Sequence, residues 1–415
     1  MKDPRFFQNI RPEELADTYA TPLYVYNERV FRTRCREMKN LVTYPNFTVH
    51  YSVKANSNLT LLKIAREEGL HVDAMSPGEI YVEEKAGFLP EEIFYISNNV
   101  SIEEMAYAVE RGICVSLDSI SQLRRFAAHF PGASVSLRIN TGIGAGHSEK
   151  VVTGGKKTKF AIPEDQLNEA VKICREASLR LKALNQHIGS FFLDGEIYLE
   201  GVKALLAAAE KVPGLELIDL GGGFGMPYDE KTQKRLDLSS LGRSLDQLFA
   251  DFSKKYAALY PESNGKEISF AIEPGRYISA ESCVLLGRVH AIKENAGHLY
   301  CGTDIGFNVL MRPVLYDSYH KIETWPVREN APVLSYTVVG NICESGDILA
   351  KDRELPQMEE NDLVIVCDAG AYGYSMASNY NNRLRPAEVL IGEDDQVRLI
   401  RRRDTLEDLV RGFES

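Results

Sequence analysis

Short apolar runs typical of buried strands alternate with amphipathic helix patterns through the first two-thirds of the chain. Eight such runs cover residues 47–55, 71–76, 93–98, 114–119, 134–140, 181–189, 215–223 and 268–275. Strands that alternate with helices indicate a parallel sheet, because each helix returns the chain to the start of the next strand. Eight such units over about 230 residues fit the size of a (β/α)8 barrel.

The segment between the first two runs carries clear helix signals. Residues 59–69 read LTLLKIAREEG, with apolar positions at helical spacing. Ser57 or Asn58 can cap the start of this helix with a side-chain oxygen, and Gly69 can end it. A helix is therefore expected between the first two strands.

The pattern changes after residue 276. The later apolar runs lie at 284–292, 334–340, 363–370, 387–392 and 396–400, with little helical pattern between them. The whole pattern predicts an α/β plus all-β architecture, with a (β/α)8 barrel over 31–276 followed by a C-terminal β domain over 277–415. The run TPLYVYN at 21–27 precedes the first barrel strand. Residues 1–30 are therefore expected to pack with the β domain.

Composition narrows the class of protein. The formal net charge of −11 argues against a nucleic-acid partner, which would favour a basic surface. No stretch of 18 apolar residues is present, and the start of the sequence has no basic cluster followed by an apolar run. The seven cysteines form no C-x-x-C pair, and the eight histidines lack H-x-x-x-H and H-E-x-x-H spacing. We therefore expect a cytoplasmic protein with reduced thiols, no membrane segment and no metal site.

Polar residues gather at the carboxyl ends of the predicted barrel strands. They are Lys54, Asp73, Asn98, Asp118, Arg138, Asn140, His187 and Glu273. Active sites of (β/α)8 barrels are built at this end, where the following loops converge. The alternative is that these residues simply mark strand ends, which predicts a mixture of residue types at either end.

Lys54 follows the first strand directly and has Val53 as an apolar neighbour. A lysine that is desolvated in a barrel mouth has a lowered pKa and becomes an amine nucleophile suited to Schiff-base chemistry. A structural lysine in an ion pair is the alternative interpretation.

A glycine run, Gly221–Gly223, follows the seventh strand. Met226 stands where a dinucleotide-binding fingerprint needs its third glycine or alanine, so that interpretation fails. Phosphate sites in these barrels use the loops after strands seven and eight, and bare glycine N–H groups can approach an anion closely. Gly275 and Arg276, after the eighth strand, could complete such a site. A tight structural turn is the alternative for the glycines.

Seven motifs then identify a family. They are YSVKANSN at 51–58, VDAMSPGE at 72–79, HIGS at 187–190, DLGGGFG at 219–225, EPGR at 273–276, CESGD at 343–347 and DAGAYG at 368–373. In this order they resemble the fold-type III pyridoxal-phosphate decarboxylases, from about residue 20 to 410. Within that group, MRPVLYDSYH at 311–320 and the sequence at 372–390 resemble the diaminopimelate decarboxylase family.

The resemblance implies pyridoxal 5′-phosphate as cofactor and assigns residues to it. Lys54 would bind the cofactor aldehyde, Glu273 would pair with the pyridine nitrogen, and His187 would stack on the ring. The further cofactor-binding residues implied are Asp73, Ser190, Gly222, Gly223, Gly275, Arg276 and Tyr372. A carboxylate beside the pyridine nitrogen favours its protonated form, and the protonated ring accepts the electrons left when carbon dioxide departs.

The resemblance also implies the substrate side of a carbon–carbon lyase. Cys343 would donate a proton to the carbanion, and Arg312 would bind the distal carboxylate of meso-2,6-diaminopimelate with its planar fork. Glu344 would accept from the distal ammonium group. The residues implied to complete the pocket are Arg276, Tyr316 and Tyr372. By the same resemblance, the Cys343 segment reaches the active site of a second subunit, which implies a homodimer with shared sites.

Some positions depart from the family's usual pattern, namely Thr141, Ala161, Asn185 and Phe191. Alternatives of the same class are decarboxylases of ornithine, arginine or carboxynorspermidine. An amino-acid racemase would need a tyrosine base where CESGD offers Cys343. A non-catalytic cofactor carrier would resemble an isolated barrel, which the β-rich region after residue 276 disfavours. Diaminopimelate decarboxylation to L-lysine, the last step of lysine biosynthesis, is the function we expect.

Overall fold

The computed structural model describes residues 5–146, 154–155, 158–261 and 267–414. The contacts of the chain divide it into two compact units. The barrel unit comprises Arg34–Met226 and Lys234–Tyr277, and the β unit comprises Met1–Thr33, Pro227–Gln233 and Ile278–Ser415. The short segment after the glycine run thus belongs, by its contacts, to the β unit.

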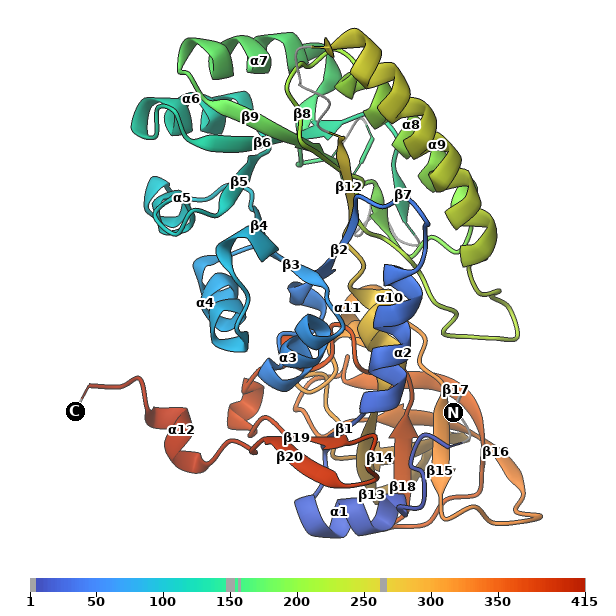
Figure 1. Cartoon of the computed structure of the whole chain (residues 1–415). Helices are drawn as coiled ribbons and strands as arrows, with labels where there is room; N and C mark the ends of the chain where they lie inside the picture. The colour runs from blue at the N-terminus through green and yellow to red at the C-terminus, as the bar shows by residue number, and fades with distance from the viewer. Residues whose placement is uncertain (1–4, 147–153, 156–157, 262–266, 415) are drawn as a thin grey trace. The chain divides into compact units, whose positions relative to one another are not determined.

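Eight parallel strands form the closed sheet of the barrel unit (Figure 1). They are β2 (Phe47–Ser52), β3 (His71–Ala74), β4 (Ile93–Ile96), β5 (Cys114–Leu117), β6 (Ser134–Asn140), β9 (Arg180–Asn185), β11 (Leu217–Asp219) and β12 (Ser269–Ile272). Each strand pairs with the next in this order, and β12 pairs with β2 to close the ring. Each strand coincides with one of the eight predicted runs. The barrel prediction is therefore confirmed.

Helices follow the strands and lie outside the ring (Figure 1). They are α3 (Leu59–Glu67), α4 (Pro77–Ala86), α5 (Ile102–Val109), α6 (Ile120–His129), α7 (Leu167–Glu176), α8 (Gly195–Ala209) and α9 (Leu238–Leu259). Short polar side chains begin several of them. Asn58 accepts a hydrogen bond from the Thr60 N–H at the start of α3, and Ser101 forms a capping box with Glu104 at the start of α5. Of the two predicted caps for α3, Asn58 is the one used.

The polar residues predicted at strand ends lie there. Asp73 and Arg138 lie near the carboxyl ends of β3 and β6. Lys54, His187 and Glu273 follow β2, β9 and β12 within two residues. The apolar strand residues below them are fully buried, for example Val72, Val115 and Phe270. A packed interior leaves the carboxyl ends of the strands as the place where polar groups converge.

The β unit is built on a mixed sheet. Its strands are β1 (Leu23–Asn27), β13 (Cys283–Asn295), β14 (His298–Thr303), β15 (Ile322–Trp325), β16 (Val333–Val339), β17 (Ile348–Pro356), β18 (Leu363–Val366), β19 (Ala387–Ile391) and β20 (Val397–Arg401). The main order is β17-β16-β14-β13-β1-β19-β20, and β18 pairs with both β13 and β15. The early strand β1 lies between β13 and β19, antiparallel to the first and parallel to the second.

Side chains of the central strands form the core of the β unit. Leu23, Val25, Leu286, Val389 and Ile391 pack in one buried cluster. The alternate positions Leu23 and Val25 come from β1, so this strand contributes to the core as well as to the sheet. The helices outside the barrel set are α1 (Pro12–Tyr19), α2 (Glu28–Lys39), α10 (Arg276–Ser279), α11 (Arg312–Tyr316) and α12 (Leu406–Val410).

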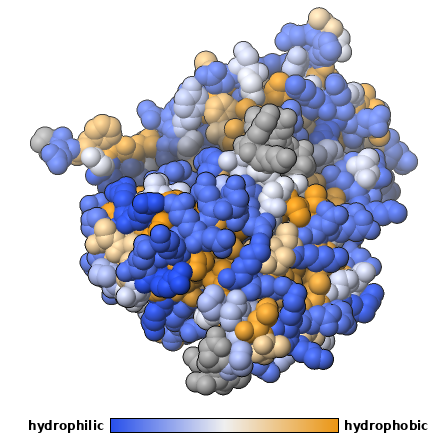
Figure 2. All heavy atoms as spheres, turned by 90° about the horizontal axis from the view of Figure 1, so that it is seen from above, coloured by the Kyte–Doolittle hydropathy of each residue, from blue (hydrophilic) through white to orange (hydrophobic). Residues whose placement is uncertain are grey.

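The described residues also limit other kinds of site. None of their helices has the length and apolar character needed to cross a membrane. None of the seven cysteines, all within the described ranges, is in a disulfide. Among the same residues no group of His, Cys, Asp and Glu is arranged to hold a metal ion. The face in Figure 2 is mostly hydrophilic, with hydrophobic residues scattered between the polar ones.

Candidate active site

The mouth of the barrel brings four predicted residues together. The positive charge of Lys54 lowers the pKa of three neighbours, Asp73, His187 and Glu273. Lys54 lies in the short 3-10 turn Val53–Ala55 after β2 and is half-buried. The Val53 N–H donates to Oδ1 of Asp73 at 3.2 Å, which ties this turn to β3. A lysine is thereby held among buried acids.

Glu273 is a buried acid of the barrel mouth. It is 5% exposed, and burial, followed by the charge of Asp219, raises its pKa well above the usual value, against the opposing charges of Lys54 and Arg138. Its hydrogen bond with Asp219 also raises the pKa of Glu273, while burial raises the pKa of Asp219 to about 7 against the lowering effect of the same hydrogen bond. Oε1 of Glu273 is buried without a hydrogen-bond partner among the described residues. A cationic N–H group beside this carboxyl would restore its charge.

Asp73 is fully buried beneath the mouth. Burial first, and the charge of Glu273 second, raise its pKa well above the ordinary value, while Lys54 opposes this. Its Oδ2 atom is also buried and lacks a hydrogen-bond partner in the described part of the chain. Two buried carboxyl oxygens at the barrel mouth, one of Asp73 and one of Glu273, thus lack a hydrogen-bond partner among the described residues. Such atoms indicate a site that accepts hydrogen bonds from a bound group.

His187 is held as a neutral ring. Its Nδ1 atom accepts a hydrogen bond from the Gly222 N–H at 3.1 Å, which places the ring proton on Nε2. Burial, with the charges of Lys54 and Arg138 next, lowers the pKa of His187 well below 6.5. Its Nδ1 atom also lies 3.7 Å from Oε2 of Glu273. A neutral imidazole in this position suits stacking on a flat heteroaromatic ring.

The predicted phosphate loop has a backbone that only glycine fits. A Cβ atom on Gly222 would lie 2.0 Å from the carbonyl oxygen of Glu273, and Gly223 has a φ of +106°. The Gly223 carbonyl accepts from the N–H groups of Phe191 and Phe192, which fixes the loop after β10 (Gly189–Ser190) beside it. The absence of side chains leaves the loop open to an anion.

Arg276 and Ser190 complete the anionic side of the mouth. Nη2 of Arg276 donates to Oγ of Ser190 at 3.0 Å, and the guanidinium lies 5.7 Å from the ring centroid of Phe191. Gly275 precedes Arg276, and a Cβ there would come within 3.0 Å of Ala55 and Ser52. The loop after strand six thus brings the Ser190 hydroxyl beside the glycine run after strand seven and the Arg276 guanidinium after strand eight. Hydroxyl and guanidinium donors next to a glycine loop are a donor set that suits a phosphate group.

Two members of this mouth were not assigned a role from the sequence. Asp219 lies directly before the glycine run, and Arg138, although noted as a strand-end residue, was given no function. Asp219 is fully buried, and Arg138 is 6% exposed and acts electrostatically on Glu273, Asp73 and His187. Their position at the ends of β11 and β6 was a usable signal, but which charged groups shift one another's pKa depends on spacing that the sequence does not show.

The predicted distal-carboxylate receptor is buried in the β unit. Arg312, the first residue of α11, is 2% exposed. Nη1 lies 2.8 Å from Nε2 of His320, and Nη2 donates to Oγ of Ser318 at 3.3 Å. The guanidinium also lies 4.6 Å from the ring centroid of Tyr228. The orientation of this arginine is fixed by contacts that the sequence analysis did not identify.

His320 is held as a neutral hydrogen-bond acceptor for Arg312. Its Nδ1 atom lies 2.8 Å from the carbonyl oxygen of Cys367, and only a protonated nitrogen can donate to that oxygen. Nε2 therefore carries the lone pair that accepts from Nη1 of Arg312. His320 closes the motif MRPVLYDSYH, so its place in a matched motif was the available signal.

The remaining predicted residues also lie in the β unit. Cys343 and Glu344 are exposed in the connection between β16 and β17. Tyr316 ends α11 and is partly buried, and Tyr372 is partly buried with a φ of +57°. A positive φ at a tyrosine is uncommon and costs energy, so the surrounding structure must hold it.

The residues at the barrel mouth fit pyridoxal phosphate. The glycine loop, Arg276 and Ser190 suit the phosphate, the carboxyl of Glu273 suits the pyridine N–H, and Lys54 suits the aldehyde. The sequence profile described as "Pyridoxal-dependent decarboxylase, pyridoxal binding domain" matches residues 28–280.

Individual relatives agree over nearly the full chain. Diaminopimelate decarboxylase of Methanothermobacter thermautotrophicus is 40% identical over 96% of this chain and 93% of its own length. A crystal structure of a diaminopimelate decarboxylase superposes with a TM-score of 0.87 at 32% identity, over 96% of this chain and 94% of the other. The Helicobacter pylori enzyme, solved with L-lysine, gives 0.86 at 30% identity over 97% and 98%. The chain belongs to the diaminopimelate decarboxylase family of pyridoxal-phosphate-dependent enzymes.

Proposed function

We propose that this chain removes one carboxyl group of meso-2,6-diaminopimelate, at its D centre, and releases L-lysine and carbon dioxide. Family membership makes it a pyridoxal-phosphate-dependent decarboxylase of lysine biosynthesis. The choice of substrate is carried by one observation: a guanidinium that is 2% exposed and oriented by His320 and Ser318. Substrates with a single amino-acid end have no carboxylate for such a group.

The barrel residues divide the work of binding and activation. Lys54 holds the aldehyde carbon through its ε-amine, and the cofactor supplies an electron sink for the electrons released with carbon dioxide. Glu273 keeps a proton at the pyridine nitrogen, because its carboxylate form is favoured only when a positive partner lies beside it. His187 packs its neutral ring against the cofactor. Gly222, Gly223, Gly275, Ser190 and Arg276, with Tyr372 of the β unit, hold the phosphate.

The residues of the β unit act on the substrate. Arg312 binds the distal carboxylate and thereby selects a substrate with two amino-acid ends. Glu344 accepts from the distal ammonium group, and Tyr316 lines the same pocket. The Sγ–H of Cys343 delivers a proton to the substrate carbon that has lost its carboxyl group, a step for which the thiol form is needed. The exposure of Cys343 and Glu344 supports a homodimer in which a second subunit covers them. We place this dimer in the cytoplasm.

A substrate panel tests the proposal. Carbon dioxide release is measured with meso-diaminopimelate, L-ornithine, L-arginine, carboxynorspermidine and L-lysine, each with the purified chain loaded with pyridoxal phosphate. We expect turnover of diaminopimelate with L-lysine as product. Arg312→Ala should raise the KM for diaminopimelate by roughly 100-fold or more, since a charged contact is lost. The cofactor absorbance should remain.

Arg411→Ala, at a side chain that is 80% exposed, is the matched control and should behave as the parent chain. Unchanged kinetics in Arg312→Ala would contradict the role of Arg312 in selecting diaminopimelate. Faster turnover of ornithine or arginine than of diaminopimelate would show that one of these is the substrate.

A further inference from the structure

The turn that carries the proposed proton donor is held in place by hydrogen bonds of its last residue. This turn, Cys343–Asp347, connects β16 to β17, and only its last residue is buried. The Asp347 carboxylate accepts from the N–H groups of Phe307 at 2.7 Å and Ile342 at 2.8 Å. Its carbonyl oxygen accepts from the Gly340 N–H at 3.1 Å. These contacts fix where the turn begins and ends, but they do not reach the two exposed residues proposed to meet the substrate.

Two neighbouring residues of another segment hold those exposed positions. Oδ1 of Asn381 accepts from the backbone N–H of Cys343 at 2.8 Å. The Tyr380 hydroxyl donates to Oε1 of Glu344 at 2.7 Å. The hydrogen bond to Glu344, followed by the charge of that carboxylate, raises the pKa of Tyr380. Both contacts come from the 3-10 turn Tyr380–Asn382.

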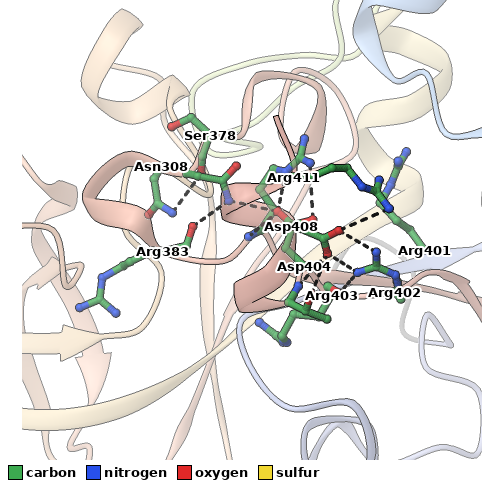
Figure 3. A network of polar contacts seen from close by, with 12 residues as sticks. Asn308, Ser378, Arg383, Arg401, Arg402, Arg403, Asp404, Asp408 and Arg411 are labelled. Atoms are coloured by element: carbon green, nitrogen blue, oxygen red, sulfur yellow. Dashed lines mark hydrogen bonds and ion pairs between the residues drawn. The ribbon is translucent and has the colours of Figure 1, made fainter. Parts of the chain in front are cut away.

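The segment that supplies these contacts is itself anchored at both ends. The Ser378 N–H donates to the Asn308 carbonyl at 2.8 Å. Nδ2 of Asn379 donates to Oδ2 of Asp404 at 3.0 Å, and Nε of Arg383 donates to the Asn341 carbonyl at 3.1 Å. Figure 3 shows Ser378 beside Asn308. The segment is therefore tied to both the β16 side and the chain near residue 404.

The backbone of this segment is in an uncommon conformation. Asn381 has a φ of +55° and Asn382 a φ of +53°, in the left-handed region. Asparagine tolerates this region better than most residues, but two in succession in an exposed turn require support. The ring of Tyr380 stacks on Phe307 at 5.5 Å with an interplanar angle of 27°. The N–H of Phe307 also donates to Asp347 at the end of the Cys343–Asp347 turn. Phe307 therefore contacts both this turn and the Tyr380 ring that holds Glu344.

We propose that Tyr380 and Asn381 are positioning residues that orient the Cys343–Glu344 pair for proton delivery and for binding of the substrate ammonium group. The inference rests on the proposed roles of Cys343 and Glu344. Asn381 fixes the backbone from which the Cys343 thiol projects, while Tyr380 fixes the carboxylate of Glu344. Exposed hydrogen bonds of this kind contribute little to folding, so a purely structural role predicts small effects of their removal.

The test compares Asn381→Gly, Tyr380→Phe and the matched control Asn382→Gly in the full-length holoenzyme. Glycine accepts the positive φ at both asparagine positions, so only the side chain is lost. Asn382 has no hydrogen bond to the turn among the described residues. The first readout is the rate of Cys343 alkylation by iodoacetamide, followed by peptide mass spectrometry. The second is kcat and KM with diaminopimelate, and the third is Tm.

Asn381→Gly should change the alkylation rate of Cys343 at least about threefold and lower kcat roughly 10- to 100-fold, because a misplaced donor loses alignment. Tyr380→Phe should raise KM about 3- to 10-fold with little change in kcat. Asn381→Asp, which restores an acceptor and tolerates the same φ, should recover most of kcat. Tm should stay within a few degrees throughout, and Asn382→Gly should match the parent chain.

Unchanged Cys343 alkylation in Asn381→Gly would overturn the inference, as would altered alkylation with parental kcat. Equal losses in Asn382→Gly would also overturn it, since they would indicate a general loosening of the segment. Failure of the proposed function has a different signature: Cys343→Ala would then retain full activity, whatever the alkylation experiment shows.

Discussion

The barrel mouth and the Cys343–Asp347 turn differ in how far their candidate catalytic side chains are buried. At the mouth, Asp73, His187 and Glu273 are buried or nearly so, and each pKa is shifted first by burial and then by nearby charges, among them that of Lys54. In the β unit, Cys343 and Glu344 are exposed, and each accepts or donates one hydrogen bond with the Tyr380–Asn382 turn. The proposed cofactor residues thus lie buried within one folded unit, whereas the proposed proton donor is exposed in the other.

The largest effect is expected at the buried end. Lys54→Ala should lower kcat by a factor on the order of 1,000 or more, because the amine nucleophile is lost. The cofactor absorbance should become removable by dialysis. Lys63→Ala, at an exposed position of α3, is the control and should keep parental activity and colour. Parental activity in Lys54→Ala would end the assignment of the cofactor attachment.

The next prediction tests whether the two ends meet between subunits. Cys343→Ala should lower kcat about 100- to 10,000-fold by removing a general acid. When inactive Lys54→Ala and Cys343→Ala chains are mixed and allowed to exchange subunits, about a quarter of parental activity should return, because half of the dimers then hold one intact shared site. No recovery in chains shown by sedimentation to exchange would contradict sharing.

A third prediction concerns how the free energy of unfolding changes with pH because of a buried glutamate near Asp73. Glu83, on α4, is fully buried, and burial, followed by the charges of Asp73 and Glu79, raises its pKa from 4.5 to about 10. Between these values the folded chain holds a proton that the unfolded chain has lost. Stability should therefore be greatest below pH 4.5 for this group and fall by about 1.4 kcal/mol per pH unit as pH rises toward 10.

Denaturant unfolding at pH 6, 7 and 8 measures this slope, and comparison with Glu83→Gln isolates the contribution of one group. The Gln variant should show a slope that is shallower by that amount. Glu84→Gln, at the adjacent position of the same helix, serves as the control. Identical slopes in the parent chain and Glu83→Gln would show that Glu83 is ionised in the folded state.

The smallest effect is expected for the support of Arg312. His320→Leu removes the Nε2 acceptor and should raise the KM for diaminopimelate roughly 10-fold with kcat nearly unchanged, because the guanidinium loses its fixed orientation. His320→Gln, which offers an amide oxygen in its place, should recover part of the loss. A fall in kcat with constant KM would instead place His320 in the chemical step.

The sequence predicted the barrel well because its eight strands are short apolar runs with polar residues at one end, as at Asp73 and Glu273. Matched motifs supplied the proposed cofactor residues, which stay a prediction. It could not show that the Asp219 and Glu273 carboxyls shift each other's pKa, since that depends on β11 and β12 being neighbouring strands that hold the two carboxyls close together. It also could not reveal the His320, Tyr380 and Asn381 contacts, because each joins residues through side-chain geometry that no periodicity records.

The position of β1 between β13 and β19 has a consequence for biosynthesis. Residues 23–27 leave the ribosome early, yet one of their two neighbouring strands, residues 387–391, is made near the end of synthesis. The barrel strands, which end at Ile272, can all be paired while the remaining third of the chain is still being translated. The apolar strand β1 must meanwhile stay unpaired on one edge, so nascent chains are expected to need chaperone protection at this segment until synthesis is complete.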